Sequence, residues 1–304
     1  MNSTTHAPGF AIHPALGSLM AVAAVTAGVG MDVLAKVAAF DASPAQVTLL
    51  RWIYGLATLI PVLAIMRVRP GPVWRPIHLA RAALNLVASF SLYYALAHLP
   101  LSLVVAIFFL EPLVALTLAA LFLGERVSRV CLAGIGIAAL GILAMTLFDG
   151  TGLSDWRLDP ALLVAFLGAL AWGTMLVMTR SVGRQEPVLA LMFWLSVLTS
   201  LGMAPMALLD WRPLGAEAHL HMFGVALLGT LYGVLGITVL RLAPVRVKAA
   251  SSFLSLPLAF LAGFLFFGEI PNAEVVLGGL LVVLGVYLAL RRPRPERVPA
   301  PESP

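Results

Sequence analysis

Charged side chains are scarce in this sequence, since Asp, Glu, Lys and Arg make up only 11% of its 304 residues. Soluble domains carry about 25% charged and about 45–50% apolar residues. Here 61% of the residues are hydrophobic, and the mean hydropathy is +1.00. A soluble fold of this length has no room to bury so much apolar surface. The composition therefore excludes an ordinary soluble domain and predicts an integral membrane protein.

Cysteine is almost absent as well, because Cys131 is the single one in the chain. One cysteine excludes an internal disulfide and a cysteine-based metal site. The sequence also lacks a nucleophile elbow, an HExxH motif, a P-loop and an evident pair of catalytic carboxylates. We therefore predict neither an enzyme nor a bound cofactor or metal.

Long apolar runs are what the sequence does contain, and a helix needs about 20 apolar residues to cross a bilayer. Ten segments meet this requirement, joined mostly by short connections. They are 15–39, 45–66, 79–97, 101–123, 129–148, 160–179, 187–208, 221–240, 246–267 and 273–290. The predicted fold class is an all-α integral membrane protein with ten transmembrane helices.

The net charge of +5 and the pI of about 9.9 would suggest a nucleic-acid partner in a soluble protein. The positions of the cations favour the lipid bilayer instead. If the N-terminus is cytoplasmic, 15 of the 19 Lys and Arg residues fall in inner segments, and the outer loops hold only Arg157 and Arg212. Inner loops of membrane proteins are enriched in Lys and Arg. We predict that both termini are cytoplasmic and that no nucleic acid is bound.

The stretch from Pro100 to Gly141 recurs from Pro244 to Gly285, at a constant offset of 144 residues and without a gap. The same offset places Gly268-Glu269 on Gly124-Glu125. Matches between apolar residues arise easily by chance. A Gly-Glu pair with further Gly and Pro matches in one register indicates an internal duplication.

The offset carries each of the first five predicted helices onto one of the last five. Because five is an odd number, the second copy must enter the membrane from the opposite side. We predict two inverted repeats, 15–148 and 160–290, joined by a linker loop at 149–159 and flanked by a tail at 1–14 and a disordered tail at 291–304. Inverted repeats are typical of secondary transporters, in which the interface between the halves can open to either side.

The pattern resembles the drug/metabolite transporter superfamily, and in particular its ten-helix proteins with two EamA-type domains. The resemblance is carried by the fourth and ninth predicted helices with their Gly-Glu ends, by the glycine-rich fifth and tenth helices, and by MDVLAKVAAF followed by QVTLLRWIYG. It covers roughly 15–290. It implies a small organic solute as substrate, the bacterial inner membrane as location, and a central cavity lined by helices one, three, four, six, eight and nine.

Without a catalytic motif, function is sought among polar side chains at membrane depth, where such groups usually face an interior cavity. Glu111 lies near the middle of the fourth predicted helix, beside Pro112, which removes a backbone donor and tends to kink a helix. This predicts a substrate or proton site. The alternative is a protonated Glu in a structural hydrogen bond. The second repeat has Ser255 at the matching position, so the halves differ here.

Three charged side chains lie toward the predicted outer side. Asp32 and Lys36 are four residues apart and share a helix face, which favours an ion pair between them. The alternatives are a charged gate and a binding pair for a zwitterionic solute. Arg51 is expected to form an ion pair with Asp32 or Asp41, or else to attract an anionic substrate.

Four further side chains complete the candidates for substrate binding or coupling. Asn85 and Tyr93 lie close to one face of the third predicted helix, Trp172 belongs to the sixth, and Tyr232 belongs to the eighth. Aromatic rings would give a solute apolar contact, and Tyr and Trp add a polar handle. Simple packing is the alternative for each of them.

Two features are predicted to be structural. Glu125 and Glu269 come just before the fifth and tenth predicted helices, where a carboxylate can favour the free N–H groups and the dipole of a helix N-terminus. The glycines of those two helices allow close helix approach, either in hairpin packing or in a dimer contact. The sequence therefore leaves open whether the protein forms a homodimer.

Together these features predict a secondary transporter, with export as the expected direction, for a small organic metabolite such as an amino acid. It would work by alternating access. A membrane-embedded enzyme and a non-transporting accessory protein are the alternatives. Polar residues that converge at mid-depth between the repeats would favour the transporter, and polar residues near one surface would favour the enzyme.

Overall fold

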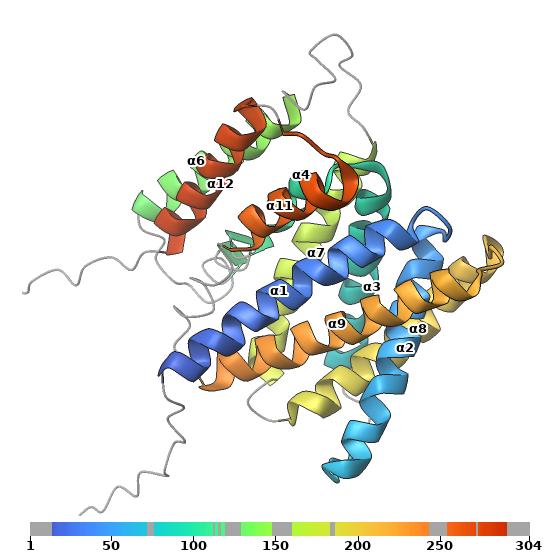
Figure 1. Ribbon diagram of the computed structural model, residues 1–304. Coiled ribbons are helices and arrows are strands. Elements are labelled where there is room, and N and C mark those ends of the chain that lie inside the picture. Colours follow the sequence, from blue (N-terminus) through green and yellow to red (C-terminus); the bar gives the residue numbers. More distant parts are fainter. Residues whose placement is uncertain are drawn as a thin grey trace, which may run out of the picture.

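A computed structural model describes residues 14–71, 76–111, 113–114, 117–118, 129–147, 160–182, 186–242, 254–271 and 273–290. Over these residues the regular elements are ten helices, drawn in Figure 1. They are α1 (Pro14–Ala38), α2 (Pro44–Ile65), α3 (Pro76–His98), α4 (Leu101–Phe108), α6 (Arg129–Leu147), α7 (Pro160–Val182), α8 (Val188–Leu209), α9 (Ala216–Leu242), α11 (Ser255–Phe267) and α12 (Ala273–Leu290). The prediction of an all-α fold with ten helices is confirmed.

Most helix ends lie within three residues of the predicted ones, but three helices differ from the prediction. α9 begins five residues early, at Ala216, and α4 ends at Phe108 although one long helix was expected. α11 begins at Ser255 instead of 246, and residues 243–253 lie outside the described residues. Six helices are long and apolar enough to cross a membrane alone: α1, α2, α3, α7, α8 and α9. α6, α11 and α12 contain shorter apolar helices. The predicted linker at 149–159 and the tail at 291–304 lie outside the described residues.

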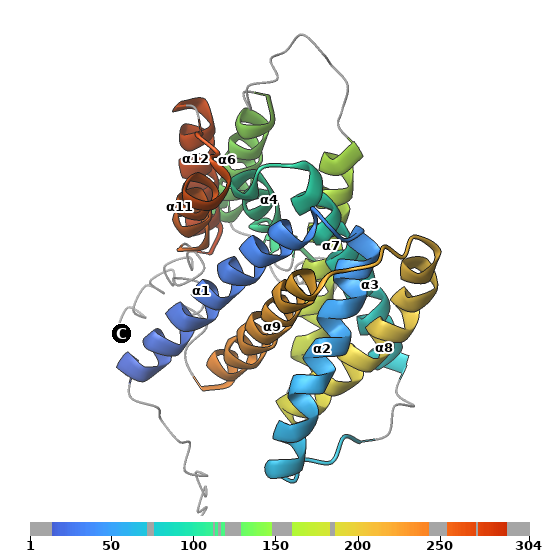
Figure 2. The same cartoon turned by 45° about the vertical axis from the view of Figure 1, so that its right-hand side comes forward.

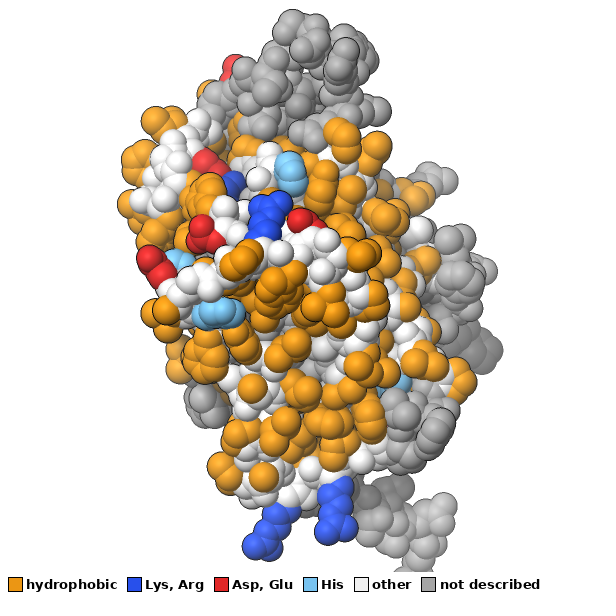
Figure 3. Space-filling view, turned by 90° about the vertical axis from the view of Figure 1, so that its right-hand side faces the viewer, with side chains coloured by type: hydrophobic (Ala, Val, Ile, Leu, Met, Phe, Trp, Pro, Cys, Tyr) orange, Lys and Arg blue, Asp and Glu red, His pale blue; other side chains and the backbone are white. Residues whose placement is uncertain are grey.

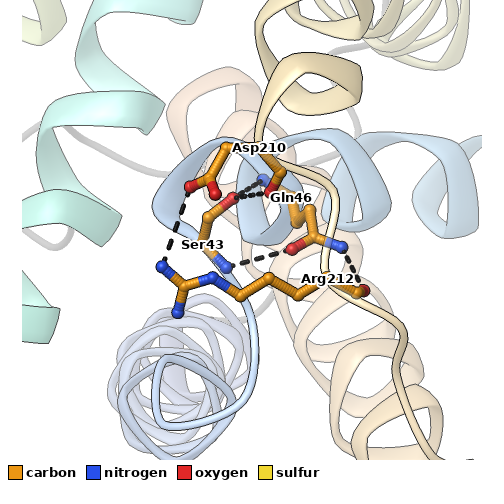
Figure 4. A network of polar contacts seen from close by, with 4 residues as sticks. All are labelled: Ser43, Gln46, Asp210 and Arg212. Atoms are coloured by element: carbon orange, nitrogen blue, oxygen red, sulfur yellow. Dashed lines mark hydrogen bonds and ion pairs between the residues drawn. The ribbon is translucent and has the colours of Figure 1, made fainter.

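The start of α2 shows how local sequence sets a helix boundary. Pro44 occupies the first turn, where its missing N–H costs nothing. Ser43 and Gln46 form a capping box: Gln46 N donates to Ser43 Oγ at 3.3 Å, and Ser43 N donates to Gln46 Oε1 at 3.2 Å. Ser43 Oγ also donates to the carbonyl of Asp210, and Gln46 Nε2 donates to the carbonyl of Arg212 (Figure 4). This network ties α2 to the connection between α8 and α9.

The packing of the helices repeats under the offset of 144 residues, which takes α1 to α7, α2 to α8, α3 to α9, α4 to α11 and α6 to α12. The contact of α1 with α9 then corresponds to that of α7 with α3. Likewise α2 with α9 corresponds to α8 with α3, and α1 with α11 corresponds to α7 with α4. The pairs α2–α8, α4–α11 and α6–α12 correspond to themselves. The two halves are therefore related by a pseudo-two-fold axis.

Polar contacts at the helix ends show that the halves are inverted. At one end of the molecule, Lys36 near the end of α1 donates to the carbonyl of Leu99, just after α3. At the other end, Arg81 near the start of α3 donates to Thr179 near the end of α7. We call these the Lys36 end and the Arg81 end. Because Arg81 and Leu99 are 18 residues apart along α3, the two ends are about 27 Å apart. The matching helices α1 and α7 thus point in opposite directions.

The pair α6–α12 stands at one edge of the molecule, and α2 and α8 lie at the other (Figures 1 and 2). A Cβ on Gly141 would lie 2.5 Å from the carbonyl oxygen of Gly278. A Cβ on Gly285 would meet the backbone of Gly134 and Ala138. The backbones of α6 and α12 therefore touch where the glycines lie, which confirms the predicted close approach and places it within one chain.

The surface agrees with a membrane setting. Figure 3 shows hydrophobic side chains in a broad band between two ends at which charged side chains lie. Large apolar side chains with more than half of their surface exposed occur on helices around the molecule, among them Leu143, Leu167, Leu201 and Leu280. Such a band is costly in water and matches the hydrocarbon core of a bilayer, which is about 30 Å thick.

Candidate functional site

A cavity of about 140 Å³, partly open to solvent, lies between the two halves. Its walls come from α1, α3, α4, α7, α9 and α11, which are the six helices that the family resemblance implies. The lining residues are Val25, Gly28, Val29, Met31, Asp32, Leu92, Val105, Phe108, Phe109, Glu111, Trp172, Tyr232 and Ser255. The cavity therefore brings together five of the nine predicted site residues: Asp32, Glu111, Trp172, Tyr232 and Ser255.

The cavity lies at the pseudo-two-fold axis, because matching positions of both repeats line it. Glu111 and Ser255 are one such pair, and Gly28 and Trp172 are another. Only positions close to the axis can meet at one place in this way. The members of each pair differ in chemistry, so the cavity walls are asymmetric even though the scaffold is not.

A break in the fourth span positions Glu111. The regular helix α4 ends at Phe108, and the N–H of Leu110 bonds to the carbonyl of Ile107 in a tighter turn. Helical residues resume at Glu111. Pro112, at which a kink was predicted, lies outside the described residues. The interruption places the Glu111 carboxyl beside a helix end, and Ser255 is the first residue of α11.

Aromatic rings form much of the wall around the two carboxyls. Trp172 and Phe108 pack edge to face, with ring centroids 6.2 Å apart. The Tyr232 ring lies where Gly28 leaves space, since a Cβ at that glycine would come within 3.1 Å of the ring. Oδ1 of Asp32 is buried and has no hydrogen-bond partner among the described residues. The cavity thus offers carboxyl oxygens and ring faces at membrane depth.

Lys36 contacts a different acid from the one expected. Its ammonium lies 2.7 Å from Oε1 of Glu269, at the end of α11, and donates to the carbonyl of Leu99 at 2.6 Å. The described side chains form no ion pair between Lys36 and Asp32, so the predicted pairing is wrong. Lys36 pairs with Glu269, which follows α11, and not with the acid one turn before it on its own helix.

Glu269 also differs from its predicted role. The backbone N–H of Leu101, the first residue of α4, donates to the Glu269 carboxylate at 3.0 Å. Glu269 does satisfy a helix N-terminus, but that of α4 rather than that of α12. Gly268 permits the approach, because it ends α11 in the left-handed conformation with φ at 64°. We call this contact of Lys36, Leu99, Leu101 and Glu269 the Lys36–Glu269 junction.

At the positions matching Lys36 and Glu269, the other repeat carries Arg180 and Glu125, again a cation and an acid. Glu125 lies outside the described residues. The agreement in charge shows that the sequence pattern behind the junction belongs to the repeat unit.

Arg51 is buried but does not line the cavity. Its guanidinium stacks on Trp52, with Cζ 4.1 Å from the ring centroid. It also lies against Gly229, where a Cβ would come within 2.6 Å of Nη2. Neither Asp32 nor Asp41 forms an ion pair with it among the described side chains. The stacking on Trp52 and the space left by Gly229 explain how the Arg51 side chain fits into the interior.

Asn85 and Tyr93 are likewise placed outside the cavity wall. Asn85 Nδ2 donates to Thr199 Oγ1 at 2.9 Å, which joins α3 to α8 in a buried contact. The Tyr93 hydroxyl lies 3.9 Å from the sulfur of Met31 and joins α3 to α1. Both side chains make contacts between helices, which is the packing alternative.

Several cavity residues carry no signal in the sequence. Leu92, Val105, Phe108 and Phe109 are apolar residues within apolar runs. In a membrane helix an apolar side chain can face lipid, a neighbouring helix or a cavity, and composition does not separate these cases. Pro112 is a signal in the sequence for a break in this part of the helix. The orientation of the rings has no such signal, because it depends on packing.

Inverted halves around a cavity with polar groups at membrane depth define a secondary membrane transporter. The sequence profile of the EamA-like transporter family matches twice, at residues 15–147 and 159–291. The chain belongs to this family, within the drug/metabolite transporter superfamily that the sequence resembles.

Similar proteins are transporters by name. The chain is 30% identical to a riboflavin transporter of Rhizobium johnstonii, over 99% of each protein. It is 24% identical to the pseudopaline exporter CntI of Pseudomonas aeruginosa, covering 91% of this chain and 96% of that one. It is 22% identical to an S-adenosylmethionine uptake transporter of Rickettsia felis, covering 83% and 84%. A solved crystal structure with a TM-score of 0.63 and 18% identity covers 91% of this chain and 98% of its own, and supports the fold alone.

Proposed function

We propose that the protein moves a small organic solute through the cavity between its repeats by alternating access. The observation that carries this proposal is the position of the cavity on the pseudo-two-fold axis of an inverted repeat. Two halves that pack symmetrically can rock about such an axis, so that the central site faces each side in turn.

The Lys36–Glu269 junction would hold the cavity closed at the Lys36 end. Lys36 lies one helical turn beyond Asp32, and Leu101 lies one turn before Val105, so the junction begins where the cavity ends. It joins α1, α4 and α11, and these three helices must separate for a solute to leave on that side. The ion pair and its hydrogen bonds would have to break and form again during each transport cycle.

Orientation and direction belong to the same proposal. The charge distribution in the loops favours cytoplasmic termini in a bacterial inner membrane, which makes the Lys36 end the outer end. Export is the direction we infer, by analogy with the relative named as an exporter. In this proposal one chain carries both repeats and the cavity that the described residues line, and the mechanism uses neither a second copy nor an enzymatic step.

Flux measurements on purified protein in proteoliposomes test this function. The panel should include riboflavin, S-adenosylmethionine and aromatic amino acids, each with empty liposomes as the control. We expect at least one saturable flux. Glu111→Gln should reduce it by about tenfold, because it removes one charge-assisted contact in the cavity. Glu274→Gln is the matched control, since Glu274 is exposed in the first turn of α12.

Two results would contradict the proposal. Folded, monodisperse protein that moves no compound of a broad metabolite panel would exclude a transporter. Unchanged flux in Glu111→Gln would remove Glu111 from the mechanism while leaving transport itself in place.

A further inference from the structure

A second group of buried polar side chains lies at the Arg81 end, outside the cavity wall. His78 and Arg81 are three residues apart on α3, so they share one face of the helix, and each is only 2% exposed. Nε2 of His78 lies 3.3 Å from Oε1 of Glu186, which comes just before α8. Arg81 Nε donates to Oγ1 of Thr179 on α7 at 3.1 Å. We call these four residues the Arg81 cluster.

The Arg81 cluster holds charge in a place where charge is costly. Arginine keeps its charge in proteins, and the carboxylate of Glu186, which is 16% exposed, attracts the Arg81 guanidinium. Nδ1 of His78 is buried and has no hydrogen-bond partner among the described residues. Such groups lose their hydration, and replacing buried ionic groups by well-packed apolar side chains is often neutral or stabilising. The cluster therefore joins α3, α7 and the start of α8 no more firmly than apolar packing would.

The other repeat carries apolar residues at all of the matching positions. Under the offset of 144 residues, the positions that match His78, Arg81, Thr179 and Glu186 are Met222, Val225, Ala35 and Ala42. None of these apolar residues is more than 1% exposed, and they belong to one apolar core. They lie at the Lys36 end, where the contact of α1 with α9 matches that of α7 with α3. The same contact of the fold is thus apolar at one end and charged at the other.

The helices joined by the Arg81 cluster also surround the cavity. Leu92 of α3 and Trp172 of α7 belong to the cavity wall, and Thr179 lies about two turns beyond Trp172 toward the Arg81 end. If α3 and α7 separate at this end, the bond between Arg81 and Thr179 breaks and water reaches the charges of the cluster. In the matching contact the same separation would expose only apolar side chains, which is unfavourable. Hydration therefore lowers the cost of separation at the Arg81 end alone.

We propose that the Arg81 cluster is the gate of the cavity at the Arg81 end, and that this gate opens when water solvates its charged groups. The matching apolar contact keeps α1 and α9 together, so these two helices move as one unit when the Lys36–Glu269 junction opens. The proposal rests on the proposed function, because it assigns the second gate of the same cavity.

The rate at which a water-soluble thiol reagent reaches the cavity tests this gate. Ser255→Cys in a Cys131→Ser background places a thiol in the cavity wall, and lipid nanodiscs give the reagent access to both faces. A fourfold variant receives the residues of the other repeat: His78→Met, Arg81→Val, Thr179→Ala and Glu186→Ala. We expect the fourfold variant to be labelled about fivefold more slowly, with an equal or higher thermal unfolding midpoint.

Removal of a single charge should act in the opposite direction. Glu186→Gln leaves the buried Arg81 guanidinium without this acid, so labelling should become about fivefold faster. Adding Arg81→Met to Glu186→Gln removes the remaining charge and should return the rate to that of the parent. Glu274→Gln, the same exchange at an exposed acid, is the control and should change nothing. A damaged fold would instead speed up labelling in every variant.

Two results would overturn the gate. An unchanged or faster rate in the folded fourfold variant would mean that α3 and α7 do not separate at the cluster. A double variant that keeps the fast rate of Glu186→Gln would mean that charge does not control the contact, and this comparison decides if the fourfold variant does not fold. The expected rates without any solute flux would contradict the transport function and leave the gate standing. Solute flux with unchanged labelling rates would contradict the gate and leave transport standing.

Discussion

Asp32 and Lys36 lie one turn apart on α1, and the two side chains make different contacts. Lys36 belongs to a contact between helices, with an acid and a carbonyl oxygen as partners. Asp32 faces the cavity and has an oxygen without a donor. Two neighbouring charges on one helix face thus have different surroundings, because Lys36 lies in the junction at the end of the cavity and Asp32 lines the cavity itself.

Asn85 provides a test at this scale, because its contact is structural in the fold although its type suggested a ligand contact. Asn85→Ala should lower the free energy of unfolding by about 1–3 kcal/mol, since it leaves the buried Thr199 hydroxyl without its partner. Thr26→Ala is the control, as that exposed hydroxyl bonds only within its own helix. Thermal unfolding in detergent measures the difference. Normal stability together with a loss of solute binding would instead mean that Asn85 contacts the solute.

At the scale of elements, the helices fall into groups with separate roles. α1, α3, α4, α7, α9 and α11 surround the cavity, whereas α6 and α12 form a pair at the edge. α2 and α8 pair at the other edge, and α2 is fixed by its capping box and the network with the α8–α9 connection. The six helices that line the cavity thus lie between two edge pairs.

The α6–α12 pair should tolerate no added methyl group at its glycines. Gly141→Ala places a Cβ against the backbone of α12, which cannot give way as a flexible side chain can. We expect a loss of about 1–3 kcal/mol in unfolding free energy. Gly136→Ala is the control on the same helix, since nothing lies within 4 Å of its Cβ position. Equal thermal midpoints for both variants would show that the two backbones do not touch.

The junction should control access to the cavity from the Lys36 end. In a Cys131→Ser background, Ser255→Cys places a thiol in the cavity wall. Adding Lys36→Met should raise its labelling by an external, membrane-impermeant thiol reagent by about fivefold, the shift expected from about 1 kcal/mol. Arg212→Met, which removes an exposed ion pair, is the control. A labelling rate that is the same with and without Lys36 would mean that the cavity is closed elsewhere.

At the scale of the whole molecule, orientation can be tested independently of any substrate. In the Cys131→Ser background, Asp41→Cys and Arg69→Cys place exposed thiols at opposite ends of α2. In intact cells an impermeant reagent should label position 41 and reach position 69 only after the membrane is permeabilised. The reverse labelling pattern would mean that the protein has the opposite orientation and that the Lys36 end faces the cytoplasm.

Hydropathy and the repeat were enough to predict the architecture, because apolar length and a constant offset are properties of the chain itself. Polar and aromatic types at membrane depth also pointed to Asp32, Glu111 and Trp172, since such groups rarely face lipid. The partner of Lys36 could not be predicted in this way. Glu269 is far along the chain, and only the packing of α11 against α1 and α4 brings it near.

The contact between α6 and α12 has one more property. Gly134 meets Gly285, and Gly141 meets Gly278, so the same two positions of the repeat meet each other with their roles exchanged. Such a surface is isologous, like the interface of a two-fold dimer. A single five-helix unit with glycine at these two positions is complementary to an inverted copy of itself. The same surface would therefore join two separate five-helix chains as readily as it joins the two halves of one.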